Sequence, residues 1–562
     1  MKNDLFTSFP FRNHEEVLML NSIRVGNFKA FAESQKIPIR PLTLIYGANS
    51  SGKSSILHSL ILARHAQETG DLDAHRTSLG GESVDLGGFR QYVHHRDASR
   101  RVELAFDLDT SDFKDRLAEL FAPVRQVTMI LNIGMSLDDQ DHPLPGAVPE
   151  IHTCELLADG QSLLRMSRRP DGTLRLDRLD HEHAVFREVI RAMVLFSTTT
   201  ETLHPEDFEG LDEEITELVP EIVIKGTKFL PDGLAESNVF VPGGQTKFFT
   251  ISKARRREDL GAAVRSFLPR KIDELLKGIS QVIAHELTRL RYLGPLRSYP
   301  PRHLAFSQYH DSNWYGGGGY AWDVVRRDAK VRESVNAWLS APDRLQTKYE
   351  LRIRHLLTID DLDQDYSQII EEIEKRFTSD EPYDWDLFGE IYSALDTIKA
   401  NETKLTDIQE LNLIDRQNDT IVSHRDVGIG ISQVLPVLVS AYASQDQIIA
   451  IEQPEIHLHP ALQSDLGDVF IESALGASHN AFIIETHSEH LMLRILRRIR
   501  ETSNGELPEG MSPIHPEDVS VIYVQPQKAG SIVIEIPVTP DGDFAVSWPR
   551  GFFAERAKEL FG

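Results

Sequence analysis

The sequence predicts an α/β fold, because short apolar strands in it run directly into turns that open helices. Residues 42–46 are apolar and partly β-branched, a run long enough for a buried strand and too short for a helix. Apolar residues then recur at helical spacing over 57–63. Two later apolar runs, 447–451 and 482–484, are also of strand length, and a glutamate follows each directly.

The turn after the first of these strands matches the whole pattern G-x-x-x-x-G-K-[ST], as GANSSGKS at 47–54. Between a strand and a helix, this pattern predicts a nucleoside triphosphate site, with backbone N–H groups and the helix N-terminus facing phosphate oxygens. Lys53 would reach the β- and γ-phosphates, and the Ser54 hydroxyl would bind Mg²⁺. The alternative, a Gly/Ser-rich turn with a solvated lysine, is the weaker reading in this context. The residues assigned to the site are Gly47, Ala48, Asn49, Ser50, Ser51, Gly52, Lys53, Ser54 and Ser55.

Length and composition indicate a large soluble protein. At 562 residues the chain exceeds what one core normally serves, so about two to four structural units are expected. The single cysteine, Cys154, cannot form an internal disulfide and fits a reducing compartment. The N-terminal residues lack the uninterrupted apolar core of a secretory signal, and no uncharged apolar stretch reaches membrane-spanning length. We therefore expect a cytoplasmic protein with no membrane contact.

The formal net charge of −26 argues against a chain that coats DNA through its overall field, although a local basic groove remains compatible with it. Three arginine groups are candidates for such a groove: 255–257, 165–169 and 494–500. Solvated or salt-bridged faces are the more ordinary reading of all three. The last group is the most interesting, because it follows directly on a motif described below.

The order of patterns along the chain suggests three parts: 1–180, 181–414 and 415–562. The first holds the phosphate-binding loop and a β-rich lobe, with strands expected over 22–25, 101–108, 126–131 and 150–157 and a hairpin over 161–179. The second is a mainly helical, acidic insertion, with a long amphipathic helix over 270–290, a helix-breaking segment at 291–302 and a glycine-rich loop at 316–319. The third part is again dense in motifs.

In that third part, the strand 447–451 ends in Glu452-Gln453-Pro454-Glu455. A carboxylate at the end of a buried strand is where a Walker B acid should lie, so that Glu452 would hold Mg²⁺ through water opposite Ser54. A Gly/Ser segment, 426–433, opens a helix just upstream, and the strand 482–484 leads into Glu-Thr-His-Ser. The two Walker motifs lie 399 residues apart, from Lys53 to Glu452.

This spacing and order resemble the ATP-binding-cassette heads of the structural-maintenance, recombination-repair and overcoming-lysogenization-defect ATPases, over residues 20–95 and 415–500. RYLGPLRSYPPR, DVGIGISQVLP, IEQPEIHLHP, ETHSEH and WPRGFF further resemble a bacterial family with a DUF3696-type C-terminus. Related ATPases serve anti-phage systems of the Septu and retron-Septu kind. The resemblance implies a mixed sheet around the P-loop helix, an antiparallel lobe, and ATP with Mg²⁺ as ligands.

The resemblance also implies roles for individual residues. Gln91 would be the Q-loop residue that senses Mg²⁺ and the γ-phosphate, so that Ser54, Glu452 and Gln91 form the metal set. The implied signature, which contacts the nucleotide of the opposite subunit, is Gly428, Gly430 and Ser432 with Gln433; His457, His459 and Pro460 would belong to the D-loop, and His487 would be the switch histidine. The signature reads G-I-G-I-S-Q, which differs from the usual serine followed by two glycines.

A second departure concerns hydrolysis. Family heads place a glutamate directly after the Walker B acid, whereas this chain has Gln453. An amide cannot accept a proton at neutral pH, although it can orient water. We expect slow hydrolysis, with ATP acting mainly as a clamp and Glu455 as the substitute base. The predicted catalytic set is therefore Glu452, Gln453, Glu455 and His487.

Other metal sites are the weaker reading of the remaining acidic and histidine patterns. His457 with His459 and His487 with His490 are candidate metal pairs, but the first pair more plausibly orders the D-loop. The alternating aspartates at 361–365 lack the glycine and closing glutamate of a calcium loop. His285-Glu286 lacks the second histidine of a zinc protease helix.

The resemblance implies a homodimer that sandwiches two ATP molecules head to tail, with room for a higher oligomer. The terminal 75 residues after His487 leave no space for a nuclease domain, so an effector nuclease would be a separate polypeptide. The alternatives are a DNA-repair ATPase that clamps DNA between its heads and, less favoured because of the large insertion, a transporter ATPase. Nucleic acid therefore stays a candidate partner.

Overall fold

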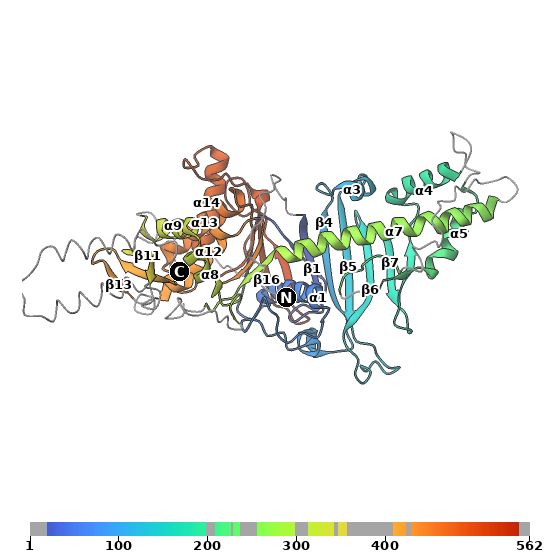
Figure 1. Ribbon diagram of the computed structural model, residues 1–562, viewed down its shortest axis with the longest axis horizontal. Coiled ribbons are helices and arrows are strands. Elements are labelled where there is room, and N and C mark those ends of the chain that lie inside the picture. The colour runs from blue at the N-terminus through green and yellow to red at the C-terminus, as the bar shows by residue number, and fades with distance from the viewer. Residues whose placement is uncertain are drawn as a thin grey trace, which may run out of the picture. The chain divides into compact units, whose positions relative to one another are not determined.

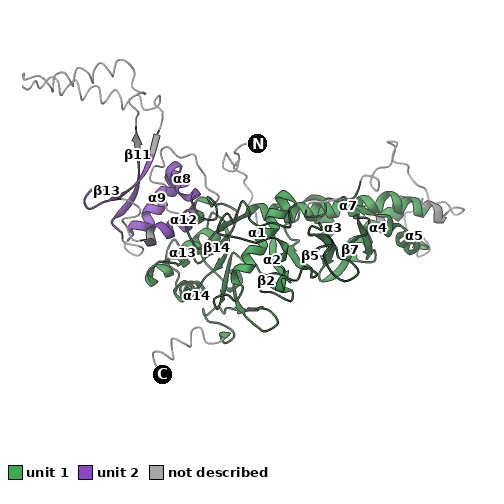
Figure 2. Ribbon diagram, turned by 90° about the horizontal axis from the view of Figure 1, so that it is seen from below, with its two compact units in different colours: residues 1–297, 312–318, 440–562 green, residues 298–311, 319–439 purple. Residues whose placement is uncertain are grey.

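The computed structural model describes residues 19–197, 208–225, 229–235, 256–297, 313–341, 347–356, 408–422 and 429–549 (Figure 1). The chain divides into two compact units (Figure 2). Unit 1 comprises residues 1–297, 312–318 and 440–562, and unit 2 comprises 298–311 and 319–439. The predicted α/β class is confirmed, with a mixed sheet around the P-loop helix and an antiparallel lobe. The three-part division into 1–180, 181–414 and 415–562 stays a prediction.

A six-stranded sheet forms the part of unit 1 that carries the predicted nucleotide motifs. Its strand order is β10 (Leu290–Leu293), β14 (Ile448–Glu452), β15 (Ala481–Glu485), β3 (Leu42–Gly47), β16 (Val519–Gln525) and β17 (Ile532–Glu535). All neighbours are parallel except β16 and β17. Every residue of β3, β14 and β15 is buried, as expected of parallel strands that helices cover on both faces.

The helices of this sheet start where its parallel strands end. α1 (Lys53–Thr69) follows β3, α13 (Pro460–Leu475) follows β14, and α14 (Glu489–Asn504) follows β15. Parallel strands place their carboxyl ends at one edge, so the loops after β3, β14 and β15 gather there. This topology brings together motifs that lie some 400 residues apart in the sequence (from Lys53 to Glu452, 399).

An eight-stranded antiparallel sheet forms the β lobe, also in unit 1. Its order is β2 (Gln35–Pro38), β1 (Leu20–Gly26), β4 (Val102–Asp109), β5 (Gln126–Gly134), β6 (Glu150–Ala158), β7 (Gln161–Arg168), β8 (Leu174–Leu179) and β9 (Val223–Ile224). The strands expected from the sequence are all present. The short edge strands β2 and β9 are additions that the sequence reading did not include.

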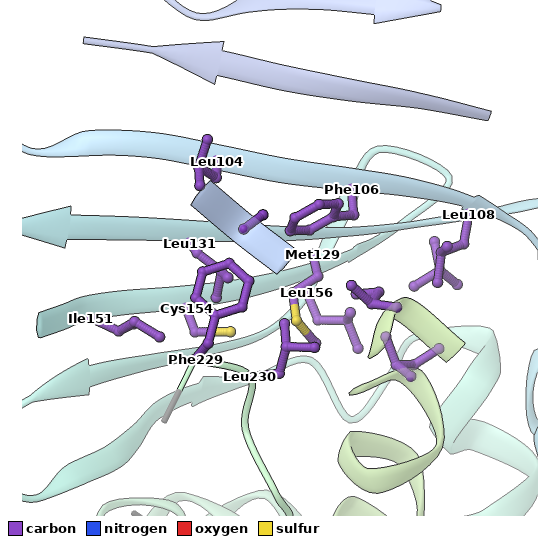
Figure 3. Close-up of a cluster of buried hydrophobic side chains, with 14 of the residues drawn as sticks. Leu104, Phe106, Leu108, Met129, Leu131, Ile151, Cys154, Leu156, Phe229 and Leu230 are labelled. Atoms are coloured by element: carbon purple, nitrogen blue, oxygen red, sulfur yellow. The ribbon is translucent and has the colours of Figure 1, made fainter. Parts of the chain in front are cut away.

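The long helix α7 (Arg256–Arg289) runs along this lobe in Figure 1. Its apolar residues, from Leu260 to Leu287, join one core with the strands. The helix was expected to begin at Arg270, but it continues through Pro269. Figure 3 shows the strand side of the core, where Phe106 packs edge-on to Phe229 and the thiol of Cys154 is enclosed. Burial raises the pKa of that thiol well above its usual range.

The described part of unit 1 also contains shorter helical segments. They are α2 (Phe89–Tyr92), η1 (His94–Arg96), α3 (Asp115–Phe121), α4 (Ala184–Ser197), α5 (Leu211–Leu218), η3 (Val219–Glu221) and η6 (Pro516–Asp518).

The expected glycine-rich loop is a packed turn over 316–318, because these residues are buried and Gly294 N–H donates to the carbonyl oxygen of Gly316 at 2.8 Å. A Cβ atom on Gly316 would lie 2.6 Å from the carbonyl oxygen of Gly80.

Unit 2 contains a three-stranded antiparallel sheet, β11 (Tyr349–Leu356), β12 (Ile408–Asp415) and β13 (Thr420–Val422). The helices in its described residues are α8 (Tyr320–Arg327), α9 (Ala329–Ser340) and the start of α12 (Ile429–Ala443). The insertion expected to be mainly helical, 181–414, thus also contains the strands β11 and β12. Both alternate polar and apolar residues, as in YELRIRHL, which is a strand pattern. The aspartates at 361–365 lie outside the described residues.

Among the described residues, no helix combines the length and apolar character that crossing a membrane requires.

Candidate functional site

The predicted phosphate-binding loop connects β3 to α1, as expected. Its two glycines have backbone conformations that other residues avoid, with φ of +151° at Gly47 and +101° at Gly52. A Cβ atom on Gly47 would lie 2.5 Å from the carbonyl oxygen of Val524, and one on Gly52 would lie 2.5 Å from Ala30 Cβ. The loop therefore requires glycine at both positions, because the hairpin strand β16 and the segment after β1 press against it.

The lysine of the loop is buried and directed back into the loop. Lys53 Nζ donates to the carbonyl oxygens of Gly47 at 3.2 Å and Ala48 at 3.1 Å. Burial lowers the pKa of Lys53, and the carboxylate of Glu485, 3.7 Å away, opposes that shift. The hydroxyl of Ser51 is buried without a hydrogen-bond partner among the described residues. A buried cation and an unsatisfied hydroxyl in a glycine cradle are the donor set that phosphate oxygens need, so the residues fit a nucleotide.

Glu485, at the end of β15, contacts the loop directly. Ser54 Oγ donates to Glu485 Oε2 at 2.7 Å. Burial, together with the negative charge of Glu452, raises the pKa of Glu485 to about 7, against the opposing effects of Ser54 and Lys53. No sequence pattern predicted a role for Glu485. The one indication in the sequence was its position at the end of an apolar strand. The sequence did not predict the strand order that places β15 beside β3.

Glu452, the predicted Walker B acid, lies at the end of β14 in register with Glu485. Its Oε1 accepts a hydrogen bond from the Tyr292 hydroxyl at 2.9 Å and lies 3.4 Å from His58 Nε2. Arg297 donates to the backbone carbonyl oxygen of Glu452 at 2.9 Å. Tyr292 and Arg297 belong to the segment RYLGPLR, which therefore has a structural role: it contributes to the edge strand β10 and fixes Glu452.

A polar chain extends from Glu452 to a surface cavity. Lys29 Nζ lies 2.7 Å from His58 Nδ1. Burial lowers the pKa of His58, which favours a neutral ring that accepts from Lys29 at Nδ1 and donates to Glu452 at Nε2. Burial also lowers the pKa of Lys29 to about 8. Lys29 and the predicted Q-loop residue Gln91 line the same cavity, of about 600 Å³. Neither Lys29 nor His58 was predicted from the sequence.

The remaining predicted catalytic residues gather at the ends of β14 and β15. Gln453 has a left-handed backbone, φ +46°, and its N–H donates to the carbonyl oxygen of Glu485 at 2.7 Å. Glu455 Oε1 accepts from the backbone N–H of His487 at 2.7 Å. Burial raises the pKa of Glu455 and lowers that of His487. Within the described part of the chain, Glu455 Oε2 and His487 Nε2 lack hydrogen-bond partners.

The D-loop and signature candidates lie in different settings. His457 and His459 are exposed, and His459 caps α13 by accepting from the N–H of Ala461 at 3.3 Å. In the signature, Gly428 lies outside the described residues, and Gly430 opens α12. Ser432 and Gln433 follow in α12 and are buried, so contact of the Ser432 side chain with a second subunit would require its exposure.

The donor set also fits a magnesium ion that arrives with the nucleotide. Across the described residues, no three His, Cys, Asp or Glu side chains form a group that could hold a metal by themselves. Magnesium at a nucleotide site does not need such a group, since phosphates and waters supply most of its ligands and the protein adds one or two oxygens. The Ser54 hydroxyl with Glu452 or Glu485 suffices.

One protein family matches two segments of the chain that hold residues of this site. The family model described as AAA ATPase domain matches residues 19–114 and 327–492. These two segments, 262 of the 562 residues, are similar to that domain. The first matched segment contains the P-loop and Gln91, and the second contains Glu452, Glu485 and His487. No curated protein matches the chain significantly.

Three solved structures of SMC heads align with the chain at TM-scores of 0.33, 0.32 and 0.32 and identities of 10%, 10% and 12%. The first is an SMC head bound to the C-winged helix domain of ScpA, and the alignment covers 92% of this chain and 98% of that one. The second is the SMC head domain from Thermotoga maritima, with 93% and 100% covered. The third, bound to the C-terminal domain of ScpA derived from Pyrococcus furiosus, has an extended coiled coil, with 96% and 98% covered.

Proposed function

We propose that this protein is a Mg²⁺-dependent ATPase of the ATP-binding-cassette type that hydrolyses ATP slowly and uses it as a switch. The observation that carries the proposal is the placement of Lys53 and Ser54 at the β3–α1 junction, within reach of Glu485 on the neighbouring strand, with Glu452 one strand beyond it. Lys53 would bind β- and γ-phosphates and Ser54 the metal. Bound Mg²⁺ would neutralise phosphate charge and orient the phosphates for attack by water.

Binding is tested directly by calorimetric titration of the full chain with the non-hydrolysable analogue AMP-PNP and Mg²⁺. Lys53→Ala should weaken binding by at least about tenfold, since a charge-assisted bond to phosphate contributes roughly 1.5–3 kcal/mol. Lys114→Ala removes an exposed lysine of the β lobe and should leave the affinity unchanged. Equal affinities of the two variants would refute a phosphate role for Lys53.

Slow hydrolysis follows from the surroundings of the two base candidates. Gln453 carries an amide, and Glu455 is buried with one oxygen bound to the His487 backbone. The raised pKa of Glu455 makes its carboxylate a stronger base than an exposed glutamate, and Oε2 is the oxygen left to act. We propose that Glu455 is the base and that its burial limits the rate.

Single-turnover cleavage of ATP tests this assignment. Glu455→Gln should reduce the rate by about 10²- to 10⁴-fold, the usual contribution of a general base, with AMP-PNP affinity unchanged. Gln453→Glu, which restores the ordinary family residue, should accelerate hydrolysis. Fast cleavage by the wild type that Glu455→Gln does not alter would contradict the assignment.

We further propose that the protein is the regulatory subunit of a bacterial anti-phage complex in the cytoplasm, controlling a separately encoded nuclease. The motifs ETHSEH and IEQPEIHLHP support this reading by their resemblance to DUF3696-type ATPases related to Septu systems. The test is co-purification with the products of neighbouring genes, with and without ATP, and loss of phage protection in Lys53→Ala. ATP-dependent retention of DNA by the isolated protein would instead favour a repair ATPase.

A further inference from the structure

The strand order makes Glu485, and not Glu452, the acid beside the P-loop. β15 pairs directly with β3, and Glu485 is in register with Ile45. β14 pairs with the far side of β15, so Glu452 lies one strand further out. Neighbouring strands are about 4.8 Å apart, which puts the backbone of Glu452 roughly 10 Å from β3 and that of Glu485 roughly 5 Å. The shorter reach to Ser54 belongs to Glu485.

The contact between Glu485 and Ser54 has the spacing of two ligands on one magnesium ion. Ser54 Oγ and Glu485 Oε2 are 2.7 Å apart. Magnesium binds oxygens octahedrally at about 2.0–2.1 Å, so that adjacent ligand oxygens lie about 2.9 Å from each other. If a metal ion replaced the hydrogen bond between Ser54 and Glu485, the two side chains would need to move only slightly.

The contacts of Glu452 differ in kind. Tyr292 and His58 both approach its Oε1, and neither belongs to the P-loop. By contrast, Glu485 binds Ser54 and approaches Lys53, the two P-loop residues that would engage a metal and phosphates. Glu452 is thus oriented by residues outside the P-loop. Glu485 is held by Ser54 and Lys53, which nucleotide binding would rearrange.

We propose that Glu485 is a direct carboxylate ligand of the Mg²⁺ ion that accompanies the nucleotide, next to Ser54. The inference rests on the proposed function. It assigns the metal to a residue outside the set expected from the sequence, Ser54, Glu452 and Gln91. Two carboxylates in register on adjacent strands, close to one another, repel when both are ionised, and a divalent cation between Glu485 and the phosphates relieves that repulsion.

The competing role for Glu485 is a plug, in which its negative charge occupies the phosphate position and opposes nucleotide binding. The two roles differ in their dependence on metal. A ligand contributes only when Mg²⁺ is present, whereas a plug hinders nucleotide with or without it. Measuring the affinity of AMP-PNP in Mg²⁺ and in EDTA separates them.

The experiment compares the full-length wild type, Glu485→Gln and Glu155→Gln by calorimetry in both conditions. Glu155 is a matched control because its carboxylate also accepts from a serine hydroxyl, Ser162 Oγ at 2.6 Å, but in the β lobe. The factor by which Mg²⁺ increases the AMP-PNP affinity should be at least about tenfold smaller for Glu485→Gln than for the wild type. Loss of a residue that only contacts a metal ligand already has an effect of this size. Its affinity in EDTA should be unchanged, and Glu155→Gln should match the wild type throughout.

A second readout uses Mn²⁺ as a paramagnetic probe with AMP-PNP, followed by electron paramagnetic resonance. Mn²⁺ should bind the wild type more tightly than Glu485→Gln, and Glu485→Asp, which keeps a carboxylate one methylene shorter, should lie between them. An unchanged Mg²⁺ effect in Glu485→Gln, or tighter binding in both conditions, would overturn the inference while the proposed function stands. No AMP-PNP binding to the wild type would overturn both.

Discussion

At the scale of single residues, the site is a set of buried charges, each compensated by a specific neighbour. Glu452 is bound by Tyr292 and approached by His58, and Glu485 is bound by Ser54 and approached by Lys53. Burying a charge is costly unless a partner is present, so these contacts hold the side chains in place before any ligand arrives. Preorganisation of this kind reduces what nucleotide binding must spend on ordering.

Lys29 should be an unusually reactive lysine. Burial lowers its pKa to about 8, so at pH 8 about half of its amine is neutral, roughly a hundredfold more than for an ordinary lysine. Lys29 also lines a cavity, which gives a small reagent access. Brief acetylation at pH 8, read by peptide mass spectrometry, should label Lys29 ahead of exposed lysines such as Lys114. Equal labelling of the two would contradict the lowered pKa.

The same shift has a consequence for stability. Since the folded pKa of Lys29 lies below that of the unfolded chain, the unfolded state binds more protons between about pH 8 and 10.4. The contribution of Lys29 to stability therefore rises with pH across that window. Lys29→Met, which keeps the length of the side chain and removes the charge, should reduce the rise of the unfolding free energy with pH in this window.

The residues missed from the sequence share a cause. Gly47, Lys53 and Ser54 were predictable because one local pattern contains them all. Glu485 and Tyr292 act through contacts that span 431 and 160 residues, and no local pattern reports such contacts. Their partners become neighbours only through the strand order β10–β14–β15–β3.

At the scale of elements, α13 and α14 are joined by a cluster of arginines and aspartates. Arg498 donates from Nε and Nη2 to the two oxygens of Asp468, at 2.8 and 2.9 Å, and Arg494 also binds Asp468. The expectation that the 494–500 arginine group is salt-bridged is thus confirmed for Arg494 and Arg498. Because α13 follows the Walker B loop and α14 follows His487, this cluster fixes two site loops relative to one another.

Asp468→Ala should destabilise the protein by about 3 kcal/mol, because it leaves two largely buried arginines without their shared partner. Urea unfolding monitored by fluorescence gives the difference. Arg500→Ala, an exposed change on the same helix, should stay within about 0.5 kcal/mol of the wild type. If Asp468→Ala lowered the unfolding free energy no more than Arg500→Ala does, the cluster would contribute little to stability.

Elements differ in how far the sequence predicted them. The apolar runs were sufficient to predict β3, β14 and β15. The turn residues were sufficient to predict the β7–β8 hairpin. β10 was missed because its four residues follow a 34-residue helix directly and pair with β14, far along the chain. The start of α7 was misplaced because Pro269 is tolerated inside the helix, where a helix boundary was expected.

At the scale of the whole molecule, the proposed switch requires two chains. Each composite site would combine the P-loop of one subunit with the signature segment around Gly430 of the other. Sedimentation should give the mass of one chain, 63.5 kDa, without nucleotide and twice that mass with Mg²⁺ and AMP-PNP. Lys53→Ala should remain monomeric in both conditions. A wild type whose mass ignores nucleotide would contradict the switch.

Mixing two defective variants tests whether the sites are shared between chains. Lys53→Ala loses its P-loop but keeps its signature, and Gly430→Glu keeps its P-loop but places a charge in the signature at the start of α12. In a head-to-tail dimer of the two, one of the two sites combines intact halves and the other combines both defects. The mixture should therefore associate with AMP-PNP where neither variant does so alone. Sites contained within one chain would give no such rescue, because each variant would carry its defect into any assembly.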